Sequence, residues 1–142
     1  MCGLCDNLFN FLINKPGPIM SRENGKMLNF NKNGLNGSLP TFIDFLQLEV
    51  LDLTYNLLSG SIESQLNGLS GLKSWNLSFN TFTGSIPIAK IHARMLTMNN
   101  FQGSIPKEIA HYRNLSWIDF TMNKLSGSLL MKIGELSLSW RS

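Results

Sequence analysis

The sequence lacks the features that define several large classes of protein. Its 142 residues contain two cysteines, and only 15% of them are charged. It has no run of eighteen apolar residues, so it contains no candidate transmembrane helix. The apolar stretch near the N-terminus follows no basic residue and is interrupted by Asn, which makes it a poor signal peptide. We therefore expect no membrane span and no leader in this sequence, and its own residues leave its location open.

Charge is sparse and weakly positive, with twelve Lys and Arg against nine Asp and Glu. The basic residues are scattered from Lys15 to Arg141 and form no run. Proteins that bind nucleic acid normally gather such residues on one face. We expect no nucleic-acid partner.

The two cysteines, Cys2 and Cys5, have the CxxC spacing of half a zinc site or of a redox motif. A zinc site needs two more ligands, and the only histidines, His92 and His111, lie far away in different contexts. A redox motif needs a βαβ setting, which is not visible around this pair. The sequence therefore predicts incidental terminal thiols, with no metal site and no cofactor.

Signatures of common catalytic sites are also missing. The sequence contains no Gly-rich loop after a strand, no HRD or DFG, no GxSxG and no HExxH. Two carboxylates, Asp52 and Asp119, occupy matching places in the chain, but they lie more than one repeat apart and are interpreted as solvated strand positions. We expect no enzyme activity from this chain, although a longer parent protein could carry a Ser/Thr kinase domain.

The sequence does contain one motif that is repeated five times. The copies read LNFNKNGLNGSLP, LDLTYNLLSGSIE, WNLSFNTFTGSIP, RMLTMNNFQGSIP and IDFTMNKLSGSLL. Their anchors are Asn33, Asn56, Asn80, Asn99 and Asn123. The steps from Asn56 to Asn80 and from Asn99 to Asn123 are each 24 residues, and seven apolar positions match between these two windows. A period of this length indicates a solenoid of stacked turns.

Each copy predicts one turn of that solenoid. The LxL before each Asn has period two, which is typical of a short strand whose alternate residues point inward. The following LxGxIP should turn the chain, because Gly allows a tight backbone and Pro stops regular pairing. The xxLxxLxx that comes next has a period near three, which suits a 3-10 or short helical return. Each anchor Asn should lie inside and satisfy backbone groups where its strand ends.

The combined pattern, LxxLxxLxLxxNxLxGxIP, resembles the plant-specific leucine-rich repeat, and the GSIP and GSLP endings make the resemblance specific. This repeat is found in the ectodomains of receptor-like kinases and receptor-like proteins, and in polygalacturonase-inhibitor-type proteins. The resemblance implies an α/β solenoid: a right-handed superhelix with short parallel concave strands and 3-10 or irregular convex returns. It also implies an extracellular or plasma-membrane setting and a role in binding peptides, proteins or glycans.

The resemblance covers residues 26–142, which we expect to form a leucine-rich repeat domain of about five repeats. Residues 1–25 are expected to form an irregular N-terminal segment, either a degenerate cap or a partial repeat. Members of this family usually carry a cysteine-bearing cap at each end, and Cys2 and Cys5 are spaced too closely for the usual pair. The C-terminal LSLSWRS looks like the opening of a further strand. We therefore expect the chain to be a piece of something longer.

The strand residues between the inward positions should line the concave side and form a candidate ligand-binding face. The residues just before each anchor Asn border the same face, and most are aromatic or Met, the kind of side chain that anchors partners. The alternative is that these residues pack along one another at the strand ends. The candidates are Asn31, Lys32, Asp52, Thr54, Tyr55, Asn76, Ser78, Phe79, Asp119, Thr121 and Met122.

Three sequons occur in the sequence, beginning at Asn36, Asn76 and Asn114. Each is a candidate for N-glycosylation if the chain enters the secretory pathway. Because Asn76 falls on the predicted concave strand, where a glycan would obstruct ligands, Asn36 and Asn114 are the better candidates.

One repeat is shorter than the others. The step from Asn80 to Asn99 is 19 residues, and it places Arg94 where an inward Leu is expected. Either the strand slips its register around Leu96 or the coil bulges there. We expect a shortened repeat, with the weakest stacking of the structure, between residues 88 and 98.

Two kinds of function follow from these observations. The first is a non-catalytic binding module, a fragment of a receptor-like kinase or receptor-like protein ectodomain. Such a module would recognise a peptide, protein or cell-wall glycan in signalling, with a co-receptor as a further partner. The second is a truncated gene-model remnant without independent function. A polygalacturonase-inhibitor-like defence protein is an alternative form of the first.

Overall fold

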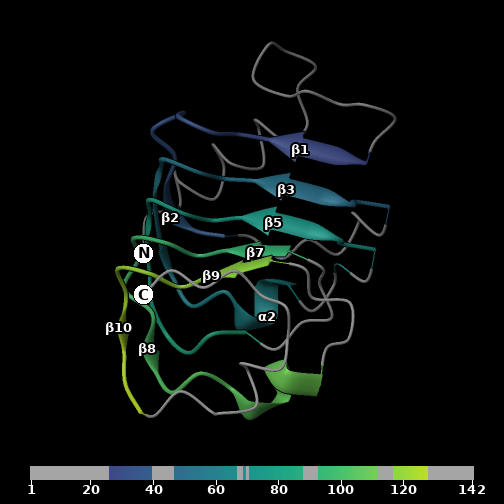
Figure 1. Ribbon diagram of the computed structural model, residues 1–142. Helices are drawn as coiled ribbons and strands as arrows, with labels where there is room; N and C mark the ends of the chain where they lie inside the picture. Colours follow the sequence, from purple (N-terminus) through teal and green to yellow (C-terminus); the bar gives the residue numbers. More distant parts are fainter. Residues whose placement is uncertain are drawn as a thin grey trace.

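The structure of the chain is a computed structural model that describes residues 26–39, 47–66, 69, 71–87, 93–111 and 117–127 (Figure 1). The expected N-terminal segment, residues 1–25, lies outside these ranges. No helix of the described residues has the length and hydrophobicity needed to cross a bilayer.

One face of the molecule is a five-stranded parallel sheet, in which each turn of the chain contributes one strand (Figure 1). Sequence order and spatial order coincide, as a solenoid requires. Each strand holds three residues, and equivalent positions of successive repeats are paired directly. The strands are β1 (Met27–Asn29), β3 (Val50–Asp52), β5 (Ser74–Asn76), β7 (Ala93–Met95) and β9 (Trp117–Asp119). This arrangement confirms the predicted leucine-rich repeat solenoid.

A second line of short parallel strands follows the anchor asparagines, where the sequence predicted only a turn. These strands form a three-stranded and a two-stranded sheet. The backbone bends at glycines in or after these strands: Gly60 has a φ of 83° and Gly84 a φ of 84°. At Gly84 a Cβ would also lie 3.1 Å from Ser61 Oγ, a tight contact, so both the backbone conformation and the close approach favour glycine. The strands are β2 (Asn36–Ser38), β4 (Leu57–Gly60), β6 (Thr81–Phe82), β8 (Gln102–Gly103) and β10 (Lys124–Leu125).

The described parts of the return segments contain short helices, as the period near three predicted. One contains a single α-helical turn, α2 (Glu63–Leu66), and another a 3-10 helix, η1 (Lys107–His111). Between the strands and the returns lies one continuous apolar core, to which every described turn contributes. Within it the rings of Phe82 and Phe101 from successive turns stack with centroids 6.3 Å apart.

The anchor asparagines join each turn to the one before it. Asn80 is 8% exposed, and its Oδ1 accepts a hydrogen bond of 3.1 Å from Leu58 N of the preceding turn. Its Nδ2 donates to Leu53 O of the preceding turn and to Leu77 O of its own turn. Asn56, Asn99 and Asn123 repeat this pattern. One amide therefore satisfies backbone groups of two turns, which explains why Asn recurs at this position.

Asn33 differs from the other anchors because it is exposed. Its Nδ2 donates only within its own turn, to Asn31 O at 3.0 Å. The described residues begin at residue 26 and include no turn before β1, so a cross-turn bond of the Asn33 side chain to an earlier turn is not among the described contacts. The expected inward position applies to the later anchors only.

The expected break in stacking at the short repeat is absent from residues 93–98. Strand β7 pairs in register with both β5 and β9. The bonds from Leu77 N to Met95 O and from Leu96 N to Asp119 O, both 2.9 Å, repeat the spacing of earlier turns. The slip of register predicted around Leu96 is therefore wrong. The alternative of a bulge in the shortened repeat stays a prediction for residues 88–92, which lie outside the described part.

Arg94 points into the core, in the column that Leu51, Trp75 and Ile118 occupy in other turns. Its side chain is 0% exposed. The predicted inward position is thus correct, and the core accommodates a guanidinium there without losing strand register.

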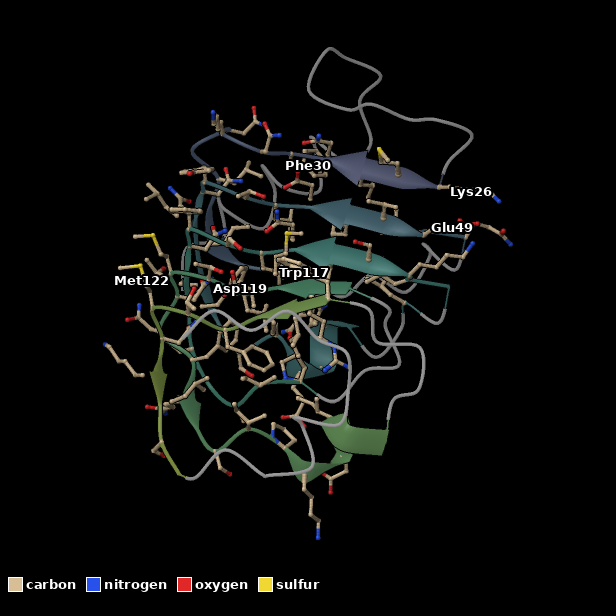
Figure 2. The ribbon with its side chains drawn as sticks, in the orientation of Figure 1. Lys26, Phe30, Glu49, Trp117, Asp119 and Met122 are labelled. Atoms are coloured by element: carbon tan, nitrogen blue, oxygen red, sulfur yellow. The ribbon has the colours of Figure 1, made fainter. Side chains whose placement is uncertain are left out.

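Three successive turns are also joined on the surface by one acidic side chain. Glu49 precedes β3, and its two carboxylate oxygens lie 2.8 Å from Lys26 Nζ and 2.7 Å from Lys73 Nζ. Figure 2 shows Lys26 and Glu49 side by side at the start of their strands. Hydrogen bonds from Lys26 and then Lys73 lower the pKa of Glu49 from 4.5 to about 2.

We predict that Asn80→Ala strongly destabilises the chain. The substitution leaves buried backbone groups such as Leu58 N unsatisfied, at about 1–3 kcal/mol for each group. The free energy of unfolding in urea measures the loss. The matched control is Asn33→Ala at the exposed anchor, which should change stability by less than about 0.5 kcal/mol. Equal losses in the two variants would contradict the cross-turn role of the buried asparagines.

We predict that Arg94→Leu costs the chain less stability than Arg94→Ala. Leu refills the column with the residue type that Leu51 contributes to it, whereas Ala leaves a cavity there. Urea unfolding of both variants makes the comparison. A loss of stability in Arg94→Leu as large as that in Arg94→Ala would show that the guanidinium itself holds this turn.

We predict that the Glu49 ion pairs make stability depend on acid. Because the pKa is lowered by folding, the unfolded chain binds more protons than the folded chain between pH 4.5 and about 2. The contribution is complete above pH 4.5 and disappears as the pH falls through that window. It should be small, since these groups are exposed. Urea midpoints of the original chain and Glu49→Gln should differ at pH 6 and converge near pH 2.

Candidate ligand-binding face

The open face of the five-stranded sheet carries one row of side chains that is polar in every strand except β7, and we call it the polar row. Pairing in register places Asn29, Asp52, Asn76, Met95 and Asp119 side by side. Four of them are half-buried, and Met95 is exposed. The residue directly before each of them points into the core, as the period of two predicted; it is apolar in four strands and is Arg94 in β7.

Each polar member of this row is fixed by the backbone two residues further along. Asp52 Oδ1 accepts a hydrogen bond of 3.0 Å from Thr54 N and another from the Thr54 hydroxyl. Asp119 Oδ1 accepts in the same way from Thr121 N and from its hydroxyl, at 2.9 and 2.7 Å. These are Asx-type turns, in which a short side chain bonds its own backbone two residues on. Asn29 and Asn76 make the same turn with Asn31 N and Ser78 N.

The same geometry removes two of the predicted contact residues from the surface. Thr54 is 8% exposed and Ser78 is 5% exposed, so neither offers much area to a ligand. Their role in this structure is to orient Asp52 and Asn76. In contrast, Asn31 is exposed and Thr121 is half-buried.

Trp117 is a large side chain on this face that the predicted set omits. It begins β9, two residues before Asp119, and is 39% exposed (Figure 2). Met95, 37% exposed, lies on the adjacent strand β7. The period-two rule that selected Asp119 also places Trp117 on the open face, so the signal was present in the sequence. In the register Met95 is paired with Asp119, so it is a diagonal neighbour of Trp117, and we call these two side chains the apolar site at the β9 end of the sheet.

A column of larger side chains borders the face, one from each turn, directly before the anchor Asn. All five adopt the left-handed conformation, with φ between 54° and 59°. Four of them are exposed: Lys32, Tyr55 by 48%, Met98 by 38% and Met122 by 69%. The members of this edge column are Lys32, Tyr55, Phe79, Met98 and Met122.

The first three members of the edge column pack against one another. The rings of Tyr55 and Phe79 are parallel within 12° and their centroids are 4.0 Å apart. Lys32 Nζ lies 5.4 Å from the Tyr55 centroid, a cation–π contact. Lys32 belongs to the turn before Tyr55 and Phe79 to the turn after, so both faces of the Tyr55 ring are covered. The column therefore presents ring edges and thioethers to a partner.

The described residues hold no group of three or more His, Cys, Asp and Glu side chains that could bind a metal ion. The ion pairs of this part of the chain join Glu49 to Lys26 and Lys73 at the strand starts. Of the sequons, Asn36 is exposed on β2 and Asn76 is half-buried on the sheet face, where its Oδ1 accepts from Ser78 N. Asn114 lies outside the described residues.

Comparison with known proteins agrees with this architecture. The family described as Leucine Rich Repeat matches residues 47–69. The chain is 36% identical to Receptor-like protein kinase 7 of Arabidopsis thaliana over 69 residues. That match covers 47% of the chain and 7% of the relative, so the chain spans only a small part of the curated relative.

Solved plant structures share the fold. The ectodomain of the receptor kinase GASSHO1/SCHENGEN3 from Arabidopsis thaliana, crystallised with CASPARIAN STRIP INTEGRITY FACTOR 2, is similar with a TM-score of 0.71 and 31% identity. This match covers 80% of the chain and 14% of the ectodomain. A chain of the BIR3–SERK2 complex from Arabidopsis thaliana has a TM-score of 0.70 and 31% identity, covering 77% of this chain and 62% of its own length.

The stacked turns, the buried asparagines and these likenesses agree with one another. The chain has the leucine-rich repeat fold and is similar to part of the ectodomains of plant receptor kinases.

Proposed function

We propose that the chain is a non-catalytic module that binds a peptide or an extended protein segment across the open face of its five-stranded sheet. The observation that carries the proposal is the apolar site of Trp117 and Met95, continued at the border by Met98 and Met122. Exposed aromatic and Met side chains are enriched at the centres of protein interfaces. A fixed polar row beside them supplies hydrogen-bonding groups of defined orientation.

The size of the face sets the size of the ligand. Five strands about 4.8 Å apart span roughly 20 Å. A standard protein interface takes about 800 Å² from each partner. This part of the chain therefore suits a short peptide or one portion of a larger epitope, with the rest of the contact made elsewhere on a longer receptor or by a co-receptor.

A cell-wall glycan is the weaker candidate. Sugar rings bind proteins largely by stacking on open aromatic faces, and the exposed Tyr55 has Phe79 on one face and Lys32 on the other. Trp117 is the single exposed tryptophan of the described residues. A single aromatic ring contributes little affinity for a polysaccharide, whereas a single ring can anchor a bound peptide.

The relatives support a receptor setting for this module. GASSHO1/SCHENGEN3 is a plant membrane receptor kinase crystallised with CASPARIAN STRIP INTEGRITY FACTOR 2, and the BIR3–SERK2 structure is itself a complex. We infer that this chain acts in the same manner, at the outer side of the plasma membrane, as part of a receptor-like kinase or receptor-like protein. Its partners would be a peptide or protein ligand and a co-receptor.

We predict that Trp117→Ala weakens peptide binding at least about tenfold, because a central aromatic anchor contributes about 2 kcal/mol or more. An array of short synthetic peptides, probed with the purified chain, identifies the binders, and titration of those peptides measures the loss. Tyr55→Ala should weaken binding less, since its ring faces are already covered.

The control is Lys107→Ala, an exposed residue of η1 in a return segment, which should bind as the original chain does. Urea unfolding of all three variants separates lost binding from lost folding. Peptides that bind Trp117→Ala and the original chain equally, or an array without any binder, would contradict the proposed function.

A further inference from the structure

We propose that the peptide preferred by this face is extended and carries a cationic side chain four residues from a large apolar one. The cation pairs with Asp52, and the apolar side chain contacts Trp117. This inference rests on the proposed peptide-binding function and adds the chemistry of the ligand. Asp52 and Trp117 lie on strands β3 and β9 of the same sheet face.

Asp52 is an oriented carboxylate on the open face that can pair with a cationic side chain of a ligand. Its Oδ1 accepts from Thr54 N and from the Thr54 hydroxyl, which fixes the side chain. Its neighbours in the polar row, Asn29 and Asn76, are neutral amides whose Oδ1 atoms accept from their own turns. The ion pairs within the described residues involve Glu49 and leave Asp52 without a cation.

The one basic side chain of the edge column has another contact. Lys32 belongs to the edge column, and its Nζ lies over the Tyr55 ring. The carboxylate of Asp52 is therefore not neutralised by this lysine. A ligand guanidinium or ammonium would complete the charge balance, and an anionic ligand would be repelled at this point of the face.

Trp117 supplies the second contact. It is 39% exposed, and the exposed Met95 lies diagonally from it on the neighbouring strand. No other aromatic residue of the described strands is exposed on this face, because Trp75 points into the core and is 1% exposed. A large apolar ligand side chain therefore finds one place on the sheet where it buries area against an aromatic ring.

The separation of the two contacts selects the spacing in the ligand. From β3 to β9 are three strand steps of about 4.8 Å, or about 14 Å, and Trp117 is offset from the polar row by two residues, or about 6.6 Å along its strand. The diagonal is about 16 Å. Side chains on one side of an extended peptide recur every second residue, at about 7, 14 and 20 Å. Only the four-residue spacing lies within about 2–3 Å of the diagonal, a gap that a long cationic side chain can cover.

Synthetic peptides test the spacing directly. In a Gly/Ser background, Arg and Phe are placed two, four or six residues apart, in both orders because the direction of the ligand is not fixed by the two contacts. Fluorescence anisotropy of labelled peptides, titrated with the purified chain, gives the affinities. We expect one order of the four-residue peptide to bind about fivefold tighter than the two-residue and six-residue peptides. Equal affinity at all three spacings would overturn the inference.

A double-mutant cycle tests the ion pair. Asp52→Asn keeps the side-chain oxygen that bonds Thr54 N and removes the charge. It should weaken binding of the Arg peptide about fivefold, the upper range for a partly exposed pair. Binding of the matched Gln peptide should not change. The control variant is Glu63→Gln, an exposed carboxylate of α2 in a return segment, which should leave both peptides unaffected.

The outcomes separate this inference from the function on which it rests. If Asp52→Asn weakens the Arg and Gln peptides equally, the cation does not pair with Asp52 and the inference fails. If peptides from the array lose affinity with Trp117→Ala but contain no cation four residues from an apolar side chain, the function stands and the inference fails. If no peptide responds to Trp117→Ala, both fail.

Discussion

The structure depends on hydrogen bonds between the side-chain amides of buried asparagines and the backbone of neighbouring turns. Asn56, Asn80 and Asn99 each bond their own turn and the one before it. These bonds close the strand ends, where the ladder of the sheet stops and polar backbone groups would otherwise be buried unsatisfied. They also hold successive turns at a constant register, so the side chains of the open face stand in straight rows. The binding surface is therefore a product of the same contacts that stabilise the coil.

The tolerance of this scaffold is visible at Arg94. The strand that carries it has a guanidinium in the core column and follows a return that is five residues shorter than the next one, since Pro87 to Ala93 is six positions and Pro106 to Trp117 is eleven. Its pairing with β5 and β9 is nevertheless regular. Strand stacking and the bonds of Asn99 are local to the inner side of the coil, so changes in the return do not reach the face. A leucine-rich repeat can thus vary in length without disturbing its rows.

Much of the fold follows from the sequence, because the period of two fixes which strand residues face the core and the recurring Asn fixes where each strand ends. The second line of strands at Leu57–Gly60 and its equivalents could not be predicted, since it forms only when neighbouring turns are already in register. The residues of the open sheet face could be predicted only in part. Period two assigns Asp52 to the surface, but the bond that buries Thr54 beside it depends on side-chain conformation. The contacts of the Tyr55 ring with Lys32 and Phe79 likewise could not be predicted, because these residues belong to the turns before and after it.

The left-handed backbone conformation of the edge column affects which substitutions the binding surface can accept. A non-glycine residue in that conformation costs about 1–2 kcal/mol, and glycine would adopt it at no cost. The chain nevertheless has Lys, Tyr, Phe or Met at all five places, with φ between 54° and 59°. Since the fold alone would be satisfied by glycine, the side chains at these places are free to vary in kind while the backbone stays constant. Each turn thus offers one position at which a new specificity can arise by a single substitution, without redesign of the coil.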